Sequence, residues 1–470
     1  MHINEPGSEV QRDASLRGFW NLFVTQFQGA FSDNVLKNLV VFMTLGVGLS
    51  QAQEHQFAEE VGALFTLPFI LFSMAGGFLA DRFSKRSITI GVKVFEVFVM
   101  LLALVALTKQ HRHLLLVCIF LMGTHSAFFG PSKYGLLPEL LPEKKLSWGN
   151  GLLELGTFTA IILGTVLASA MGERLHGRHV WSGVILIGLA FVGLATSLGI
   201  SRVPAADPTK RFQINFVADL WNRLKAIRGD RPLVLAVLGN MYFTFIGQLV
   251  LLNLFFYGHG VLHLNKIEIG YLNAALALGI GFGSVAAGYL SGGKIEYGLV
   301  PLGAMGLAVF SASLAIPGAT FIGALVMLAF LGLSGGFFIV PVSALLQHRP
   351  DKTRKGELLA AANLLSFVGA FIASGAHYLF AQVLNLSPLE IFLVGGVMTF
   401  AGSVYAVTLL PDALLRFVLW VLTRTIYGFA WTAGTTFPPK AVHCSCAIIC
   451  RWLMRCSCWR RRTGKFDSSC

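Results

Sequence analysis

The chain has 470 residues, of which 55% are hydrophobic and only 13% are charged. So much apolar surface cannot be hidden inside a water-soluble globule, so the composition excludes that class and favours a bundle of membrane helices. The formal net charge of +13 does not indicate nucleic-acid binding. Roughly half of it falls in the last forty-odd residues, and most of the rest lies in loops between apolar segments.

Twelve apolar runs of about twenty residues are candidates for membrane-spanning helices. The first six are Gly18–Ser50, Ala58–Ala80, Ser87–Leu107, His113–Leu137, Trp148–Gly172 and Val180–Ile200. The second six are Leu233–Tyr257, Ile267–Ser291, Gly298–Pro317, Thr320–Leu346, Glu357–Val383 and Pro388–Leu410. We therefore predict an all-α membrane protein with two six-helix halves, residues 18–200 and 233–410.

Lys and Arg gather in the loops at one end of these segments, which predicts that this end is cytoplasmic. The loops rich in Lys and Arg contain Arg82, Lys85, Arg86, Lys144, Lys145, Arg202, Lys210, Lys294, Arg349 and Lys352. Both termini are then cytoplasmic, including the tail at residues 1–17. The linker at residues 201–232 carries Phe216, Leu220, Leu224 and Ile227 at helical spacing, which predicts a basic amphipathic helix at the membrane surface. A tether between the halves explains this helix more simply than a partner-binding role.

An internal repeat supports the two halves. Gly77–Asp81 ends the second span and Gly288–Gly292 ends the eighth, while Phe128–Pro131 in the fourth is echoed by Phe337–Pro341 in the tenth. Asn150 and Asn363 open the fifth and eleventh spans. Three pairs in the same order, at a nearly constant offset, indicate duplication.

The segment Gly77-Phe78-Leu79-Ala80-Asp81-Arg82-Phe83-Ser84-Lys85-Arg86 resembles the cytoplasmic loop signature of the major facilitator superfamily. A glycine allows close helix approach, and an acid here can pair with cations or cap a helix end of the next span. The gating candidates are Gly77, Asp81, Arg82, Lys85 and Arg86. The sequence departs from the signature at Ser84 and, in the second copy, at Gly292. The simpler alternative is a turn with cytoplasmic charges.

Ionisable and amide groups at membrane depth are costly and usually face a cavity. The candidates for substrate binding all lie in the first half, and they are Asp33, Asn34, Lys37, Lys93, Glu96, Lys133 and Glu154. Structural alternatives stay open: Asp33 with Lys37, and Lys93 with Glu96, are spaced to form ion pairs, and Lys133 can snorkel.

The second half offers polar groups but no buried charge, namely Asn240, Gln248, Asn253, Asn273, Asn363 and His377. A cavity with one charged wall and one mostly apolar wall suits an amphiphile with a zwitterionic head group better than a sugar. No His/Cys cluster with metal spacing occurs in the bundle, so we expect neither a metal nor another cofactor.

Three stretches resemble one branch of this superfamily, the bacterial lysophospholipid transporters. They are Phe31–Asn34 with Lys37, Ser126–Glu139, and Asn150–Glu154, within a resemblance that runs from about Gly18 to Tyr427. The resemblance implies a multi-pass inner-membrane protein that flips lysophospholipid, chiefly lysophosphatidylethanolamine, from the outer to the inner leaflet. It also implies an acyltransferase/acyl-carrier-protein synthetase partner that re-acylates the lipid, and in some bacteria the two are fused.

The end of the chain bears on that fusion. Fused relatives continue past a post-bundle segment, here residues 411–427, into an acyltransferase. Residues 428–470 carry no His-x4-Asp motif but six of the seven cysteines. Back-translated and read two nucleotides later, this tail can spell Val-Arg-Asn-His-Met-Ser-Leu-Ala-Asp. We interpret it as an out-of-frame remnant, and the chain as the transporter half of a fused lysophospholipid transporter/2-acylglycerophosphoethanolamine acyltransferase.

The resulting hypothesis is a transporter without enzymatic activity, whose two halves rock about a central cavity. Two alternatives remain. The first is a proton-coupled drug or metabolite antiporter in which Asp33 or Glu154 carries the proton. The second is a membrane anchor for a glycerophospholipid acyltransferase.

Overall fold

The computed structural model describes residues 6–44, 51–175, 177–210, 225, 227–292, 295–350 and 355–409. All of them belong to one compact unit, Met1–Leu414. The amphipathic helix predicted around Phe216, Leu220 and Leu224 lies outside the described residues. So do the segments 411–427 and 428–470, and the predictions made for these parts remain predictions.

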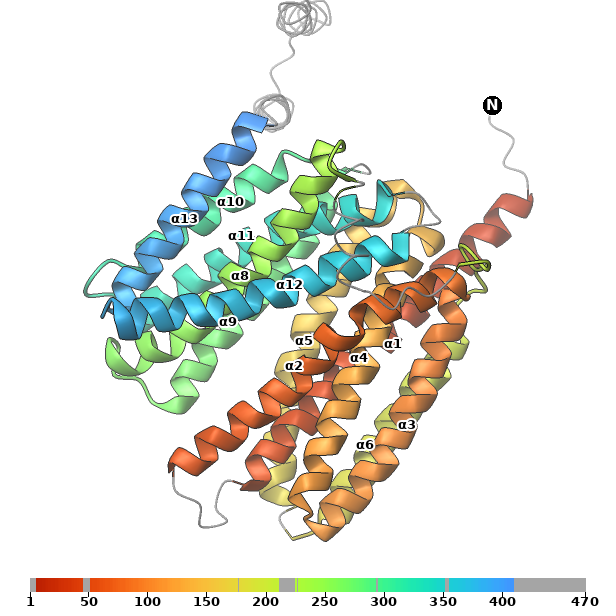
Figure 1. Ribbon diagram of the computed structural model, residues 1–470, viewed down its shortest axis with the longest axis horizontal. Helices are drawn as coiled ribbons and strands as arrows, with labels where there is room; N and C mark the ends of the chain where they lie inside the picture. The colour runs from red at the N-terminus through yellow and green to blue at the C-terminus, as the bar shows by residue number, and fades with distance from the viewer. Residues whose placement is uncertain are drawn as a thin grey trace, which may run out of the picture. The chain divides into compact units, whose positions relative to one another are not determined.

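Twelve α-helices of 16 residues or more make up the described part of the chain (Figure 1). The first six are α1 Pro6–Thr44, α2 Gln51–Arg82, α3 Lys85–Lys109, α4 Arg112–Leu140, α5 Leu146–Arg174 and α6 His179–Leu198. The second six are α8 Arg231–Gly260, α9 Lys266–Leu290, α10 Leu299–Leu314, α11 Phe321–His348, α12 Lys355–Tyr378 and α13 Pro388–Leu409. A 3₁₀ turn precedes α5 at Glu143–Lys145, and a π-helical turn at Leu379–Val383 extends α12. No strand occurs in the described ranges, which agrees with the predicted all-α class.

Ten of these helices are long and apolar enough to cross a membrane. The apolar helix α10 is shorter, at 16 residues. Helix α1 does not meet the same criterion, because polar side chains such as Asp33, Asn34, Lys37 and Asn38 interrupt its apolar run. A helix this polar is stable at membrane depth only when other helices cover it.

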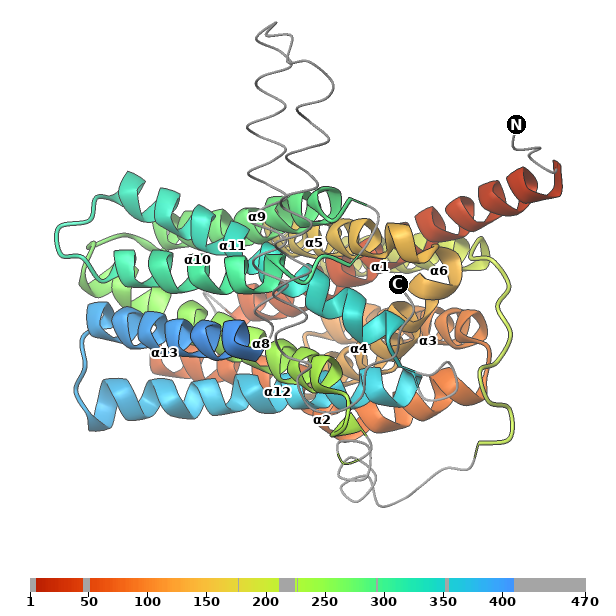
Figure 2. The same ribbon diagram turned by 90° about the horizontal axis from the view of Figure 1, so that it is seen from above.

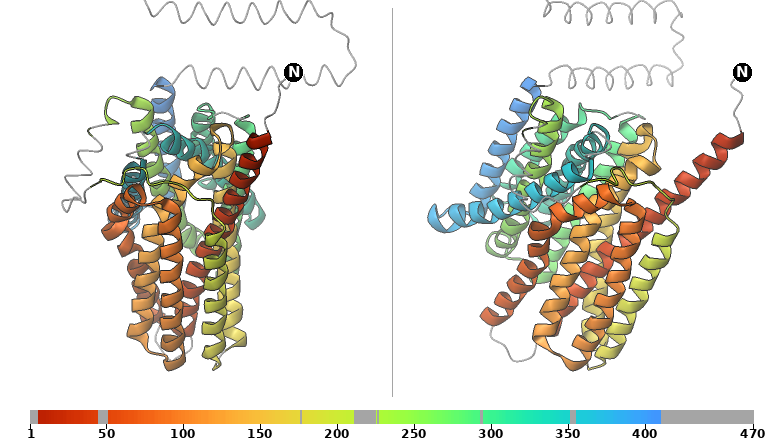
Figure 3. Two further views of the ribbon diagram at one scale, coloured as in Figure 1. Left: turned by 90° about the vertical axis from the view of Figure 1, so that its right-hand side faces the viewer. Right: turned by 45° about the vertical axis from the view of Figure 1, so that its right-hand side comes forward.

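The helices form two bundles, α1–α6 and α8–α13 (Figures 1 and 2). In Figure 3 the red-to-yellow helices of the first bundle run alongside one another as one group. Contacts inside the bundles correspond: α1 packs on α5, α2 on α4 and α3 on α6, as α8 packs on α12, α9 on α11 and α10 on α13. The duplication read from the sequence is therefore repeated in the packing.

Glycines bring the helices of the second bundle close together. Added Cβ atoms at Gly279 and Gly283 of α9 would overlap carbonyl oxygens of α11, and one at Gly336 would overlap the backbone of α9. Such backbone-to-backbone contact is the way membrane helices associate, since lipid offers no hydrophobic driving force between them.

The two bundles meet mainly through two helix pairs, α2 with α12 and α5 with α9; α4 also contacts α11 and α12, and α5 also contacts α11. The rings of Phe69 on α2 and Phe367 on α12 lie 4.3 Å apart. On the other pair, a Cβ at Gly151 of α5 would overlap the Ser284 carbonyl of α9. Both pairs continue to what we call the basic end, the end of the bundle where Arg82, Lys85 and Lys144 lie.

Candidate transport site

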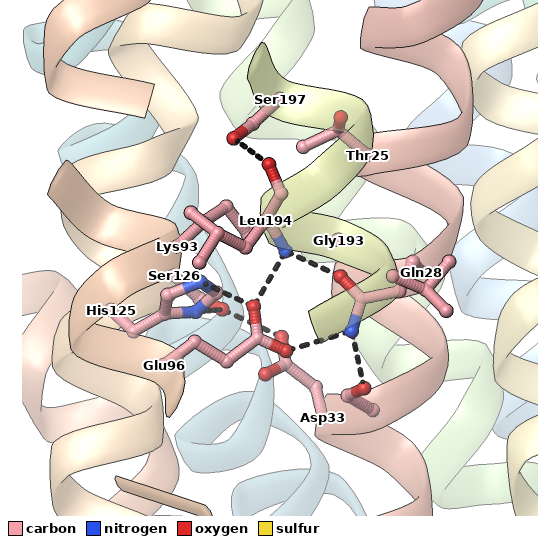
Figure 4. Close-up of polar contacts among 12 residues, drawn as sticks. Thr25, Gln28, Asp33, Lys93, Glu96, His125, Ser126, Gly193, Leu194 and Ser197 are labelled. Carbon is pink, nitrogen blue, oxygen red and sulfur yellow. Dashed lines mark hydrogen bonds and ion pairs between the residues drawn. The ribbon is translucent and has the colours of Figure 1, made fainter. Parts of the chain in front are cut away.

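A closed polar network lies inside the first bundle (Figure 4). Lys93 Nζ and Glu96 Oε2, both on α3, form an ion pair of 2.6 Å, and neither side chain is exposed. Gln28 of α1 joins both partners, because it accepts a hydrogen bond from Lys93 (2.8 Å) and donates one to Glu96 (2.9 Å). The charges of Lys93 and Glu96 are thus met by each other and by α1.

Asp33 is connected to this network through α4. Ser126 Oγ donates to Asp33 Oδ2 at 2.6 Å and lies 3.3 Å from His125 Nδ1. The other side of the His125 ring, Nε2, lies 3.2 Å from Glu96 Oε2. The second carboxylate oxygen of Asp33, Oδ1, is buried without a hydrogen-bond partner. Asp33 therefore has an acceptor to spare.

The Asp33–Lys37 ion pair considered as an alternative is not formed. The Lys37 ammonium lies 5.3 Å from the centre of the Phe65 ring, a cation–π contact with α2. Asn34 binds its own helix, donating to the Ala30 carbonyl at 2.8 Å. Helical spacing allowed the ion pair, but the contacts with α2 and α4 direct the two side chains to other helices.

A cavity of about 230 Å³ lies between the two bundles. The first bundle supplies Tyr134 and Glu154, whose side chains approach each other with the hydroxyl 3.4 Å from Glu154 Oε1. The second bundle supplies the rest of the lining, namely Asn240, Phe243, Thr244, Ile339, Ser343, Leu346, Gln347, Leu359, Ala362, Asn363, Ser366 and Phe367. Of the predicted binding residues, only Glu154 lines this cavity.

The expectation of a mostly apolar wall in the second half is wrong for this cavity. Six of the twelve residues that the second bundle contributes are polar, and Asn240 Nδ2 donates to Ser366 Oγ at 2.6 Å. These side chains are uncharged amides and hydroxyls, so composition alone understated how polar this wall of the cavity is. One wall therefore carries an acid and the opposite wall carries neutral donors and acceptors.

Lys133 lies beside the cavity without lining it. Its ammonium is 4.6 Å from the Tyr134 ring centre and 5.9 Å from that of Phe129. The side chain is half-buried, and among the described residues no acid lies within ion-pair distance of it. The faces of the Tyr134 and Phe129 rings therefore stabilise this cation.

The predicted gate residue Asp81 joins the two bundles at the basic end. Its Oδ1 accepts a hydrogen bond from the Gly356 backbone amide (2.7 Å), and its Oδ2 forms an ion pair with Lys210 (2.8 Å). Gly356 lies in the first turn of α12, where free backbone amides favour an anion. The sequence allowed two roles for Asp81, pairing with a cation or capping the next span. Asp81 pairs with Lys210, and the helix start that it contacts belongs to the other bundle.

The remaining gate candidates attach neighbouring segments at the same end. Arg86 donates to the carbonyls of Ile200 and Leu198 (2.7 and 2.8 Å), which fastens α3 to the end of α6. Buried Lys85 pairs with Glu139 at 2.5 Å. Arg82 donates to the Lys210 carbonyl at 3.1 Å. The Gly77 carbonyl lies against Gly356, close enough that a Cβ there would sit 2.9 Å from it.

The start of the linker is held on this loop as well. Asp207 donates its backbone amide to the Asp81 carbonyl (2.9 Å), and Ser84 Oγ donates to Val203 (2.7 Å). Thr209 donates to the Asp207 carboxylate, which lowers the pKa of that exposed group. An ionised Asp207 thus fixes the turn that positions Lys210 beside Asp81.

The described residues contain no group of three or more His, Cys, Asp or Glu side chains arranged to hold a metal ion. What the site offers is an acid, a nearby cation, aromatic faces and neutral amides around a cavity shared by two bundles. Such a set can bind a polar or zwitterionic group and release it when the bundles move.

Comparison with known proteins assigns the family. The sequence profile of the Major Facilitator Superfamily matches residues 22–374. The chain belongs to this superfamily. It is 28% identical over 358 residues to the lysophospholipid transporter LplT of Salmonella typhimurium (strain LT2) and to that of Salmonella newport (strain SL254). Each alignment covers 74% of this chain and 84% of the relative.

Solved structures show the same fold. The fucose transporter FucP, in its outward conformation, superposes with a TM-score of 0.66 at 16% identity over 84% of this chain and 98% of its own. The human organic anion transporter MFSD10 gives 0.68 at 13% identity, over 86% and 100%. The predicted major facilitator fold is confirmed.

Sequence reasoning missed Gln347, Tyr134 and Ser126 as partners of the predicted residues. Tyr134 and Ser126 lie inside the stretch that carried the family resemblance, but neither is ionisable at membrane depth near neutral pH, so the search for charges passed over them. Gln347 lies in the penultimate position of α11, where an amide reads as an ordinary helix end. Its contact with Asn150 joins two bundles, and no pattern in the sequence indicated it.

Proposed function

We propose that this superfamily member moves lysophospholipid across the bacterial inner membrane, from the outer to the inner leaflet, by alternating access. The observation that carries the proposal is the cavity between the bundles, where an acid faces a wall made half of neutral amides and hydroxyls and half of apolar side chains. The similarity to lysophospholipid transporters over 74% of the chain supports the same substrate. The direction of transport is the one that the resemblance to lysophospholipid transporters implies, and it presupposes the predicted orientation with the basic end in the cytoplasm.

The groups around the cavity match the two charges of a lysophosphatidylethanolamine head group. Glu154 lines the cavity and suits the ammonium, while Lys133, beside Tyr134, suits the phosphate. A charge in hydrocarbon costs at least a few kcal/mol unless it is paired, so both ends of the zwitterion need a partner on the way across. The amides of Asn240 and Asn363 complete the hydrogen bonding on the opposite wall.

The size of the cavity limits what it encloses. At about 230 Å³ it is smaller than the roughly 300–1,000 Å³ of pockets that surround a whole drug-sized ligand. In this state it therefore suits a head group and not a head group with its acyl chain. We propose that the single chain stays between helices, in contact with lipid.

The predicted binding residues divide into three groups on this proposal. Glu154 and Lys133 serve the head group directly. Asp33, Asn34 and Lys37 lie on α1, and Asp33 reaches α4 through Ser126; we propose that they receive the head group at an earlier step. Lys93 and Glu96 are fully buried against each other, and we propose that they maintain the fold of the first bundle.

The test is lipid flipping by the reconstituted protein. Glu154→Ala and Asp33→Ala should each abolish movement of lysophosphatidylethanolamine between leaflets while the bundle remains folded. Glu60→Ala is the matched control, because this acid pairs with Arg112 on the exposed surface and should transport normally. Wild-type rates in both acid variants would assign these residues to the fold and contradict the proposal.

A proton-coupled antiporter is the second candidate. The buried, unpartnered Oδ1 of Asp33 favours it, because a buried carboxylate short of hydrogen bonds is a natural place for a proton. Efflux of a soluble cation that requires a proton gradient, with no lysolipid movement, would replace the first candidate by this one.

We further propose that a cytoplasmic acyltransferase consumes the imported lysolipid, and that residues 428–470 derive from the start of such a domain in another reading frame. Sequencing the gene a few hundred nucleotides downstream tests this. A downstream frame that encodes the acyltransferase is expected. Its absence would separate the transporter from any fused enzyme, and would leave the transport proposal unaffected.

A further inference from the structure

Two buried amides connect the bundles below the cavity. Asn150 Nδ2 donates to Gln347 Oε1 at 2.9 Å, and Gln347 Nε2 donates to Asn150 Oδ1 at 2.7 Å. Neither residue has any exposed surface. Asn150 belongs to α5 and Gln347 to α11, so this reciprocal pair joins one six-helix bundle to the other.

The pair occupies a defined level of the molecule. Asn150 lies four residues after the start of α5 at Leu146, and Gln347 lies one residue before the end of α11 at His348. Both helix ends belong to the basic end. Glu154, one turn further along α5, and Ser343, one turn back along α11, line the cavity. Gln347 itself lines the cavity, so the amide pair forms the boundary of the cavity on the side of the basic end.

Residues next to the Asn150–Gln347 pair pack tightly against α9 at the same depth in the molecule. Gly151, next to Asn150, packs so tightly that a Cβ would overlap the Ser284 carbonyl of α9. One turn nearer the basic end, Trp148 packs on Gly288, where a Cβ would lie 2.8 Å from the Trp148 Cα. A head group in the cavity cannot pass this level unless α5 moves away from α9 and α11.

We propose that Asn150 and Gln347 form a latch that holds the cavity closed toward the basic end, and that Gln347 is the positioning residue that couples the cavity to the separation of the bundles. This rests on the proposed alternating-access function. An amide pair suits a latch that must open repeatedly. Each amide donates and accepts, so water can replace both hydrogen bonds once the bundles part, whereas a separated ion pair would leave charges to be solvated.

Hydrogen–deuterium exchange of the full chain in lipid nanodiscs tests the latch without any cargo. Gln347→Leu and Asn150→Leu should each favour the state open at the basic end by roughly tenfold, the effect of losing about two net hydrogen bonds. Backbone amides of residues 143–155 and 343–350 should then exchange faster. Amides at the opposite end, such as residues 60–66, should exchange more slowly, because the bundles close there as they open at the basic end.

Two further variants separate a latch from a merely structural pair. The exchanged pair, Asn150→Gln with Gln347→Asn, keeps both amides and should return the exchange pattern toward wild type. Asn253→Ala removes a buried amide that bonds the Pro388 carbonyl within the second bundle, and it should not shift the balance between the two ends. Faster exchange at both ends in the leucine variants, or no change at either, would overturn the proposal.

A final experiment tests the latch and the proposed cargo separately. Lysophosphatidylethanolamine added to wild-type protein should raise exchange at the basic end, as loss of the latch does. If the variants behave as predicted and the lipid has no effect, the latch is supported and lysophosphatidylethanolamine is contradicted as cargo.

Discussion

An ion pair between Lys93 and Glu96 lies wholly inside the first bundle, on a helix that otherwise presents apolar side chains to lipid. Gln28 binds both partners, and the His125 ring approaches Glu96. Every strong acceptor of Glu96 is thus occupied by a donor of the same bundle. A pair so enclosed is part of the packing of α1, α3 and α4.

Replacing one partner of the Lys93–Glu96 pair should destabilise the protein more than replacing both. Glu96→Gln or Lys93→Met alone leaves one charge buried without its partner, and we expect a loss of about 3 kcal/mol in unfolding free energy. The double variant leaves no such charge and should recover a large part of the loss. Thermal unfolding of the purified protein measures all three. Single variants that stay as stable as wild type but lose transport would place these residues in the substrate pathway.

The sequence could predict this pair only in part. Spacing of three residues on one helix brought Lys93 and Glu96 within reach of each other. Whether the pair faced a cavity or the interior depended on Gln28 and His125, which come from other helices. For Asp33 and Lys37 the same kind of spacing misled, because Ser126 and the Phe65 ring offer better partners.

At the scale of elements, Asp81 connects α2 to the start of α12. Asp81→Asn keeps the size of the side chain but removes the charge that faces both the helix start and Lys210. We expect a several-fold slower lysolipid flipping rate with little change in lysolipid affinity, because the residue holds a conformation and touches no cargo. Flipping rates and equilibrium binding, measured on the same preparation, decide this.

Arg349→Gln is the matched control for Asp81. It removes the Arg349–Asp230 ion pair, which also lies at the basic end but within the second bundle. This variant should flip lysolipid normally. An Asp81→Asn protein with normal turnover and weakened binding would show that Asp81 belongs to the binding site.

Turnover should also be sensitive to any change in the close packing of α5 on α9. Gly151→Ala inserts a methyl group against the Ser284 carbonyl, so the basic end cannot close fully, and we expect turnover to fall by about tenfold or more. Gly375→Ala is the control, because a Cβ at Gly375 of α12 meets no atom within 4 Å. Transport assays of the two variants at equal expression compare them, and equal activity would mean that the contact tolerates a shift of the helices.

The elements themselves were largely predictable. Apolar length predicted twelve spans in their order, and the described part of the chain has twelve long helices at these positions. The predicted Gly298–Pro317 appears as Leu299–Leu314. Contacts between bundles were not predictable. The Asp81–Gly356 and Asn150–Gln347 hydrogen bonds each join residues about 200 or more positions apart in the chain. Neither hydropathy nor helical spacing carries information about such contacts.

At the scale of the whole molecule, the two bundles meet at the basic end through three kinds of contact. Asp81 binds the start of α12, Asn150 binds Gln347, and Gly151 lies directly on α9. The cavity lies behind these contacts, with an acid on one wall and neutral amides on the other. On the proposed alternating-access mechanism, these contacts break together, since each joins the bundles at the same end.

Movement of a single-chain phospholipid between leaflets is the central claim, and one measurement tests it most directly. The wild-type protein is reconstituted into vesicles that carry lysophosphatidylethanolamine or two-chain phosphatidylethanolamine, labelled in one leaflet. We predict rapid loss of the labelled lysolipid from that leaflet and little movement of the two-chain lipid, because a second acyl chain has no comparable place beside a cavity that encloses only a head group. Equal rates for both lipids, or no movement of lysophosphatidylethanolamine above empty vesicles, would contradict the account.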